Sequence, residues 1–279
     1  MENISTTQIK IKRVNSSQLI DSDDELAIEE PLEIQLGYTE KNARMQNTIS
    51  ITMRTPGNDE ELAVGFLFTE GIIKNKNQVA HIHVSLAENK VLVLLNENEK
   101  VNLQKTERNF YTTSSCGVCG KTSIDAIKTI SAYRNVPDQI SIGASLFYQL
   151  ENELRKQQAI FESTGGLHAS ALFDLEGKFI FLKEDVGRHN ALDKLVGAAF
   201  LKQELPLTNK ILLLSGRASF ELVQKATMAG IKIIAAVGAP SSLAVQLAEE
   251  AGITLIGFLR NEGFNIYSGE GRIILNDEF

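Results

Sequence analysis

Two cysteines, Cys116 and Cys119, are the only thiols of the chain, and they lie in a polar, glycine-flanked stretch that ends at Lys121. A structural cysteine is usually surrounded by apolar residues, whereas a reactive one is exposed and its thiolate is stabilised by cations or backbone N–H groups. Lys121 and the start of a following helix can supply both. The placement of the pair therefore predicts sulfur chemistry rather than packing.

The Cys-x-x-Cys spacing also occurs in zinc half-sites, in thioredoxin-like redox pairs and in incidental disulfides. A thioredoxin-like pair follows a buried apolar strand, but the residues before Cys116 are mostly hydroxyl residues. Zinc would need two further ligands, and the Cys-x-x-Cys spacing alone leaves a zinc site open. Besides carboxylates, the other possible zinc ligands are His81, His83, His168 and His189. Because the chain holds no second Cys-x-x-Cys, we expect no intrinsic metal.

The composition is that of a globular chain with one large or two ordinary domains. It has 279 residues, 43% of them hydrophobic and 23% charged. The net charge of −7 argues against non-specific nucleic-acid binding, which needs a basic surface. No apolar run approaches the roughly 20 residues needed to cross a bilayer, and the N-terminus lacks a signal-peptide core. We therefore expect a cytoplasmic protein that keeps its thiols reduced and binds neither nucleic acid nor membrane.

The first third of the chain predicts a smaller α+β N-terminal domain, residues 1–108. One helix is expected from a cap at Asn58 or Asp59 to Leu67, with Gly71 just beyond its end. The last part of this region, from Asn96 to Arg108, is polar and indicates a connector. Alternating and β-branched residues predict strands at 9–14, 32–36, 48–54, 81–86 and 90–95.

Residues 109–160 are expected to carry the cysteines on a loop, followed by helices at 121–130 and 144–157. From residue 161 onward, strands and helices alternate. The first two strands, 169–173 and 179–183, are expected to form a hairpin. Continuous apolar strands then predict a largely parallel sheet with helices on both faces, and so the α/β class; the strands are 211–214, 231–237 and 253–259, and the helices 190–202, 220–229 and 243–250.

In such a sheet, ligands bind beyond the carboxyl ends of the strands, where helix N-termini favour anions. The loops expected there are rich in hydrogen-bond donors. Arg188 and Arg217 can bind phosphate oxygens through their planar guanidinium groups. Serines in these loops either cap helices or donate to a ligand; they are Ser215, Ser219, Ser241 and Ser242. Together the loops predict a site for a nucleotide-like anion, without a Walker P-loop or a Gly-x-Gly-x-x-Gly motif.

Two histidines and a C-terminal loop belong to the same prediction. His168 follows two glycines that would let backbone approach a ligand or simply turn the chain. His189, next to Arg188, suits acid–base chemistry, a phosphate contact or a structural role equally. The stretch from Phe258 to Gly263 could close the pocket, with Arg260 as a third cation.

Five segments in one order closely resemble the FdhD family of formate dehydrogenase accessory sulfurtransferases. They are Cys116–Cys119, Thr164–His168, Glu184–Lys194, Ser215–Lys225 and Ala239–Val245. The resemblance implies a sulfur carrier, in which a cysteine desulfurase loads Cys116 as a persulfide. The sulfur then passes to the molybdenum bis(molybdopterin guanine dinucleotide) cofactor, a bound substrate, before its insertion into formate dehydrogenase. A homodimer is also implied.

The resemblance extends to the cofactor contacts and the fold. The expected contacts are Arg188, His189, Ser215, Arg217, Ser241, Ser242, Phe258, Leu259, Arg260, Asn261, Glu262 and Gly263. Residues 161–279 are expected to form a cytidine deaminase-like three-layer αβα domain. Zinc deaminases use His-x-Glu followed by Pro-Cys-x-x-Cys, whereas His168 here lacks the glutamate and follows the cysteines, so the fold is expected without the zinc chemistry.

Two questions stay open at this point. Cys119 is expected to relay the sulfur or to resolve the persulfide as a disulfide, and the roles of Cys116 and Cys119 could be reversed. The alternative function is a non-catalytic chaperone that binds the molybdenum cofactor and docks it onto the dehydrogenase. Both functions need the anion-binding loops, but only the sulfur carrier needs Cys116.

Overall fold

The computed structural model describes residues 5–41, 43–99, 101, 131, 133 and 139–275. The two cysteines, most of the expected connector and the helix expected at 121–130 lie outside these ranges. Within them, none of the helices has the length and apolar character that crossing a membrane requires.

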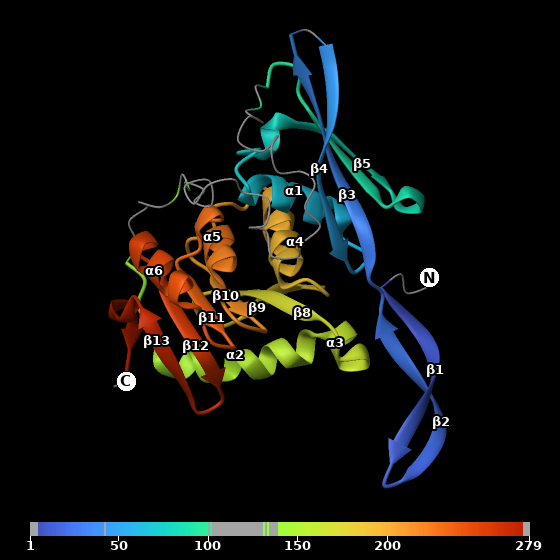
Figure 1. Ribbon diagram of the computed structural model, residues 1–279. Coiled ribbons are helices and arrows are strands. Elements are labelled where there is room, and N and C mark those ends of the chain that lie inside the picture. Colours follow the sequence, from blue (N-terminus) through green and yellow to red (C-terminus); the bar gives the residue numbers. More distant parts are fainter. Residues whose placement is uncertain are drawn as a thin grey trace.

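The N-terminal part begins with a hairpin that stands away from the body of the molecule (Figure 1). It consists of β1 (Thr6–Asn15) and β2 (Gln18–Ala27), which pair antiparallel. A separate sheet has the strand order β4-β3-β6-β5, in which the central pair is parallel and the outer pairs are antiparallel. Its strands are β3 (Glu30–Glu40), β4 (Ala43–Arg54), β5 (Val79–Ser85) and β6 (Lys90–Leu95).

Helix α1 (Asp59–Thr69) packs on one face of this sheet. Ile34 of β3 and Val93 of β6 are fully buried in the same hydrophobic cluster as Leu62 of α1. The expected boundary at Asn58 and Asp59 is confirmed, but Asn58 has a left-handed backbone and makes no side-chain capping bond. The α+β character predicted for this region is thus confirmed for its described residues.

The C-terminal part is built on a six-stranded sheet of order β13-β12-β11-β10-β8-β9. Only the pairs β10–β11 and β11–β12 are parallel, whereas the pairs made by β8, β9 and β13 are antiparallel. The expected hairpin of the first two strands is confirmed, but the largely parallel sheet is wrong, and the sheet is mixed. The strands are β8 (His168–Phe173), β9 (Phe179–Asp185), β10 (Ile211–Leu214), β11 (Ile233–Ala236), β12 (Thr254–Arg260) and β13 (Gly263–Ser268).

Helices cover both faces of this sheet, as predicted (Figure 1). Alternation along β10 sends Leu213 toward Phe147 of α2 and Leu212 toward the opposite cluster, which includes Leu192 of α4. One face carries α2 (Ala144–Gln157) with the short α3 (Ala159–Thr164) beside it, and the other carries α4 (Arg188–Leu201), α5 (Phe220–Met228) and α6 (Ser242–Ala251). The part is therefore three-layered; its likeness to cytidine deaminases in particular stays a prediction.

Helices α1 and α4 join the two parts through an unusually close contact. A Cβ atom built on Gly65 of α1 would lie 1.9 Å from the backbone oxygen of Asp193, and one on Gly197 of α4 would lie 1.8 Å from that of Glu61. Only glycine permits this approach at either position. One hydrophobic cluster runs from the N-terminal sheet through both helices to the large sheet. The division at residues 108 and 160 stays a prediction: residue 108 lies outside the described ranges, and residue 160 lies within α3.

Several short elements were not predicted. Strand β2 was missed because it is acidic, and β13 because it is short and interrupted by glycine and asparagine. The remaining ones are α3, the paired strands β7 (Ile142–Gly143) and β14 (Ile273–Ile274), and single 3₁₀ turns at Lys76–Gln78, Leu86–Glu88 and Glu270–Arg272.

Candidate functional site

Loops that follow the three parallel strands meet at one edge of the large sheet. The backbone N–H of Gly238 donates to the carbonyl of Gly216 at 2.9 Å, and that of Ser241 donates to Ala218 at 3.0 Å. Phe258 donates to Gly238 at 3.2 Å. These bonds join the loops after β10, β11 and β12 into one surface, as expected for the carboxyl ends of adjacent parallel strands.

Two antiparallel strands bring further groups to the same edge. Because β8 runs antiparallel to β10, its first residue, His168, lies at the carboxyl end of β10, and its partner Asp185 ends β9. Helix α4 then begins at Arg188. A Cβ atom on Gly216 would lie 3.3 Å from Nδ1 of His168, so this glycine leaves room for the ring. The structure thus brings together His168, Arg188, His189 and Arg217, which the sequence placed on separate loops.

This edge of the sheet is electropositive. The pKa of His168 is lowered, first by burial and then by the positive charges of Arg188, His189 and Arg217, which outweigh the negative charge of Asp185. The Nε atom of Arg188 is buried and has no hydrogen-bond partner in the described part of the chain, while Arg217 is exposed. A neutral imidazole beside two guanidinium groups and a helix N-terminus is suited to receiving an anion.

His189 has a defined partner. Its Nε2 lies 2.7 Å from Oε2 of Glu221 and 3.4 Å from Oγ of Ser219. A Ser-His-acid triad needs both ring nitrogens, one for the serine and one for the acid. Since a single nitrogen faces both groups here, His189 does not activate Ser219; it connects the start of α4 to the start of α5.

The serines divide between structural and open positions. Ser215 accepts a hydrogen bond from the backbone N–H of Ala169 at 2.8 Å, and Ser241 caps α6 by accepting from Ala244 at 3.3 Å. Capping, the alternative that the sequence left open, is therefore the role seen for Ser241. Ser242 is exposed at the first position of α6.

The stretch from Phe258 to Gly263 is a strand–turn–strand segment, and its expected role in closing the pocket stays a prediction. It forms the end of β12, a turn at Asn261 and Glu262, and the first residue of β13, where Arg260 pairs with Gly263. The side chain of Leu259 is fully buried in the core. That of Arg260 donates to the carbonyl of Val237 at 2.8 Å, so it braces the neighbouring loop. Phe258 is 46% exposed and has a left-handed backbone, with φ of 52°.

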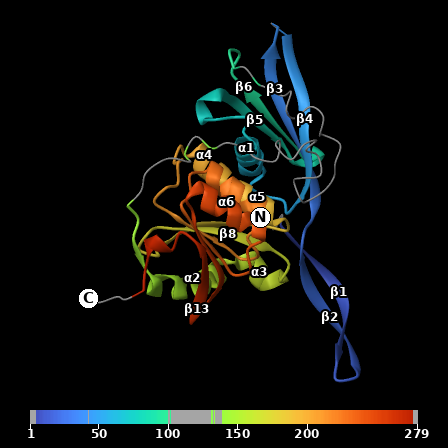
Figure 2. The ribbon, with the colours of Figure 1, turned by 60° about the vertical axis from the view of Figure 1, so that its left-hand side comes forward.

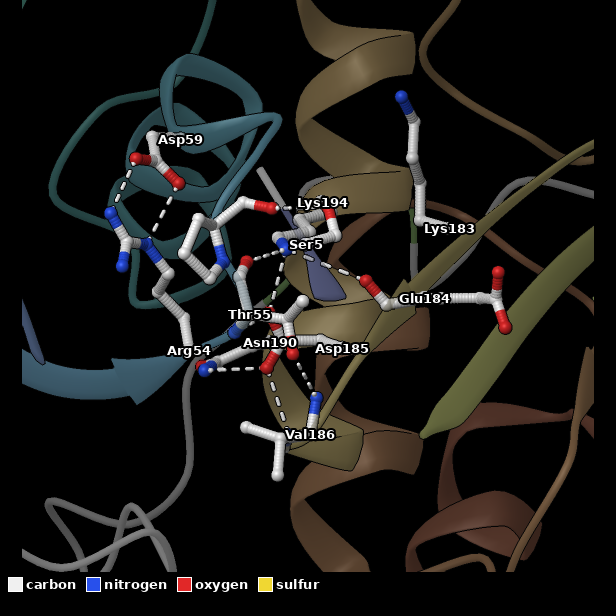
Figure 3. Close-up of polar contacts among 12 residues, drawn as sticks. Ser5, Arg54, Thr55, Asp59, Lys183, Glu184, Asp185, Val186, Asn190 and Lys194 are labelled. Carbon is white, nitrogen blue, oxygen red and sulfur yellow. Dashed lines mark hydrogen bonds and ion pairs between the residues drawn. The ribbon is translucent and has the colours of Figure 1, made fainter. Parts of the chain in front are cut away.

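Sequence reasoning missed a buried polar junction between the two parts of the molecule (Figure 3). Lys194 of α4 forms an ion pair with Asp185 at 2.7 Å and donates to the carbonyl of Thr55 at 2.8 Å. Asp185 also accepts from the backbone N–H of Thr55 at 3.2 Å and from Asn190 at 3.1 Å. Arg54 adds a two-pronged ion pair with Asp59, at 3.0 and 2.9 Å. Much of the segment Glu184–Lys194 therefore holds the structure together.

A second buried cluster lies between α1, α4 and α5. Lys225 forms an ion pair with Asp193 at 2.9 Å and donates to Thr69 at 2.9 Å. Burial alone would lower the pKa of Lys225, but the negative charges of Asp193 and Glu70 outweigh that effect and raise it. Helix α4 is buried almost all round, which is the signal that would have revealed these roles, because charges on a buried helix must be paired.

The remaining groups named in the sequence are two cysteines and two histidines. Cys116 and Cys119 fall outside the described residues. His81 and His83 are exposed on β5, with ring centroids 5.6 Å apart. Where the chain is described, no three His, Cys, Asp or Glu side chains gather as a metal site would require.

The described chain is thus a mixed α/β protein whose arginine and histidine side chains gather where its parallel strands end, an arrangement suited to binding an anion. A family model described as the FdhD/NarQ family matches residues 27–274. The chain belongs to this family. That match confirms the resemblance found in the sequence.

Relatives agree over nearly the whole length. The chain is 46% identical to a sulfur carrier protein FdhD of Mycolicibacterium paratuberculosis, with 96% of this chain and 98% of the relative covered. It is 45% identical to the protein of that name from Streptomyces coelicolor, with 97% of this chain and 96% of the relative covered. It is 41% identical to the sulfur carrier protein FdhD of Sulfurisphaera tokodaii, with 96% of this chain and 98% of the relative covered.

One solved structure has the same fold. It is the crystal structure of a candidate formate dehydrogenase accessory protein from Desulfotalea psychrophila. The TM-score is 0.70 at 23% identity, with 97% of this chain and all of that chain covered. At this identity the likeness supports the mixed α/β fold alone.

Proposed function

We propose that the chain is a sulfurtransferase that carries sulfur to molybdenum bis(molybdopterin guanine dinucleotide) before this substrate enters formate dehydrogenase. The observation that carries the proposal is the near full-length identity of 46% to a sulfur carrier protein. Two features support it: the chain has a Cys-x-x-Cys pair, and the sheet edge gathers cations. We place the protein in the cytoplasm, where thiols stay reduced.

The loading step follows from thiol chemistry. The Cys116 thiolate attacks the outer sulfur of a persulfide on a cysteine desulfurase, so a new S–S bond forms and the desulfurase thiolate leaves. Cys116 then carries the outer sulfur as its own persulfide. Passing that sulfur to the substrate regenerates the Cys116 thiolate, and two electrons from the acceptor convert the sulfur to sulfide.

The sheet edge supplies binding. Arg188 and Arg217 are the groups that we propose for the phosphates of the guanine dinucleotides, since guanidinium forms paired charge-assisted bonds with phosphate oxygens. The exposed Phe258 ring is suited to stacking on a base. Ser242, at the first turn of α6, adds a hydroxyl donor beside a helix N-terminus. Binding and sulfur loading thus use different residues.

Cys119 is proposed to assist Cys116. In one role it takes over the outer sulfur. In the other, its thiolate attacks the inner sulfur of the Cys116 persulfide, which forms a Cys116–Cys119 disulfide and releases hydrosulfide. If a Cys119→Ser variant loads and transfers sulfur at the normal rate, Cys119 has neither of these roles.

The test of loading is intact-protein mass spectrometry after incubation with a cysteine desulfurase and cysteine. We expect an added sulfur on the wild type and on Cys119→Ser, and none on Cys116→Ser. Alkylation of the thiols before incubation should block the addition in every variant. No addition to the wild type, with a control acceptor loaded in parallel, would contradict the carrier function.

The alternative is a chaperone that binds the same substrate without sulfur chemistry. It needs the cationic edge but not Cys116. Cells that carry Cys116→Ser in place of the wild type decide between the two, because a chaperone would still yield active formate dehydrogenase. We expect no activity in these cells, with Cys116→Ser present at the wild-type level.

A further inference from the structure

The loops that follow β10 and β11 run side by side at the cationic edge of the large sheet. They lead into α5 and α6, which are neighbours on one face of that sheet (Figures 1 and 2). The strands β10 and β11 pair in parallel, and a parallel bridge between Ala218 and Pro240 beyond them keeps the same offset along the chain. The two loops therefore continue the register of the strands, and this register brings Arg217 beside Gly238.

Gly238 is in direct contact with Arg217. A Cβ atom built on Gly238 would lie 2.9 Å from the Cα, the Cγ and the backbone nitrogen of Arg217. Carbon atoms that are not bonded to each other pack at about 3.5–4.0 Å, so a side chain at position 238 would collide with Arg217 where it now lies. Because Cγ is one of these atoms, the side chain of Arg217 starts out over the bare Cα of Gly238.

Space, rather than backbone conformation, requires glycine at this position. The φ angle of Gly238 is not positive, so the left-handed region that favours glycine is not the reason. Its N–H donates to the carbonyl of Gly216 at 2.9 Å, and its carbonyl accepts from Phe258 at 3.2 Å. Where the backbone permits alanine, replacing glycine usually stabilises a protein by restricting the unfolded chain. The neighbouring arginine is what makes glycine necessary here.

Strand β12 supports this loop from the side opposite to β10. A Cβ atom on Gly257 of β12 would lie 2.8 Å from Cδ of Pro240, so the loop already touches the strand closely. The side chain of Arg260 also holds the carbonyl of Val237 at 2.8 Å. Arg217, in contrast, is exposed. A new side chain at position 238 would therefore displace Arg217 rather than the loop after β11.

We propose that Gly238 is a positioning residue for anion binding. Its bare Cα seats the backbone and the first side-chain carbons of Arg217, so that the guanidinium group extends from a fixed base. A fixed base reduces the freedom that the side chain loses when a phosphate binds. The inference rests on the proposed role of Arg217 in phosphate binding, and it adds a residue that acts through this arginine.

The contact is tested first without any ligand, by the NMR cross-peak of the Arg217 Nε–Hε group in the full chain. Arg217→Lys and Arg188→Lys assign the two cross-peaks. Gly238→Ala should shift that of Arg217 more than that of Arg188. Gly271→Ala adds the same methyl group where nothing lies within 4 Å and should shift neither. An Arg217 cross-peak that stays in place in Gly238→Ala would mean that Gly238 does not seat Arg217.

The consequence for binding is tested by isothermal titration with GDP, well below the melting temperature of each variant. Gly238→Ala should raise the Kd for GDP by about threefold to tenfold. In a chain that already carries Arg217→Ala, the same change should raise it by less than about twofold, because the guanidinium group that it displaces is gone. A general loosening of the loops would instead multiply the two effects.

The outcomes separate this inference from the proposed function. If Arg217→Ala weakens GDP binding and Gly238→Ala does not, or if the two effects multiply, Gly238 is not a positioning residue and the proposed function stands. If Arg217→Ala binds GDP as the wild type does, the proposed role of Arg217 is wrong and the inference fails with it. Should Gly238→Ala fail to fold, adding Arg217→Gly removes Cγ and frees the backbone, so folding should return; no rescue would place the collision elsewhere.

Discussion

At the scale of single residues, the site depends on guanidinium groups that the fold brings to one edge of a sheet. Arg188 is held at the start of α4 with a buried Nε that has no partner in the described chain, and Arg217 is exposed on the neighbouring loop. These are different situations for two residues with the same proposed task. Arg188 is already oriented by burial, so it loses less freedom when an anion binds.

We therefore expect Arg188→Ala to weaken guanine-nucleotide binding more than Arg217→Ala. A charge-assisted hydrogen bond contributes about 1.5–3 kcal/mol, which corresponds to roughly a 10- to 100-fold rise in Kd. Isothermal titration with GDP measures the change. Arg155→Ala, an exposed arginine on α2 that pairs with Glu151, is the matched control and should bind normally. Unaltered binding in both site variants would make these arginines structural.

His168 gives the site a predictable pH dependence. Its pKa is lowered by burial and by the adjacent arginines, so the folded protein disfavours the protonated ring. The associated stability is present above the ordinary histidine pKa of about 6.5 and is lost as the pH falls through that value toward the lower folded pKa. The melting temperature of the wild type should drop more between pH 7.5 and 5.5 than that of His168→Gln.

A bound anion opposes the arginine charges and should raise the pKa of His168. An NMR titration of the His168 ring with and without the anion measures this change.

The sequence placed these residues at the correct edge but misjudged their neighbours. Loops after parallel strands converge by topology, so the positions of Arg188 and Arg217 followed from the order of strands and helices alone. Asp185 and Lys194 were noted only as members of the segment Glu184–Lys194, because a charged residue in a sequence looks the same whether it faces solvent or a buried partner. Likewise, the left-handed backbone of Phe258 lies where the register between β12 and β13 shifts, and β13 was not predicted.

At the scale of elements, the close crossing of α1 and α4 decides whether the two parts dock. Two elements with a strong pattern were predicted to the residue. In α2, burial of one face fixes the periodicity, whereas β10 is buried on both faces and is therefore continuously apolar. The crossing could not be predicted. Gly65 and Gly197 each look like a weak position in a helix, and their reason appears only when the other helix is present.

Gly65→Ala is expected to destabilise the fold. The added carbon would meet the backbone oxygen of Asp193, which cannot move without shifting α4. Overpacking of this kind costs about 1–3 kcal/mol, or roughly 2–4 °C in Tm for each kcal/mol in a chain of this size. Gly271→Ala, where nothing lies within 4 Å of the new carbon, is the control. A Gly65→Ala protein that melts with the wild type would mean that the helices separate more easily than their packing indicates.

At the scale of the whole molecule, the buried ion pairs connect the N-terminal sheet to the sheet that carries the site. Asp185 holds both the backbone of Thr55 and the ammonium group of Lys194, while the site begins three residues later at Arg188. The N-terminal part therefore does more than precede the cysteines: it braces the loop from which α4 and its arginine start. Damage at the junction should reach the proposed anion site, although the junction residues are not among the groups proposed to bind the anion.

Lys194→Met tests this connection. It leaves Asp185 buried without its cation, which typically costs about 3–5 kcal/mol of unfolding free energy. Adding Asp185→Asn removes the stranded charge while keeping an acceptor for Thr55, so the double variant should regain part of the loss, as urea unfolding would show. GDP affinity of the folded single variant should also fall, because the loop leading to Arg188 loses its anchor. If affinity stays at the wild-type level while stability falls, the junction holds the two parts together without positioning the site.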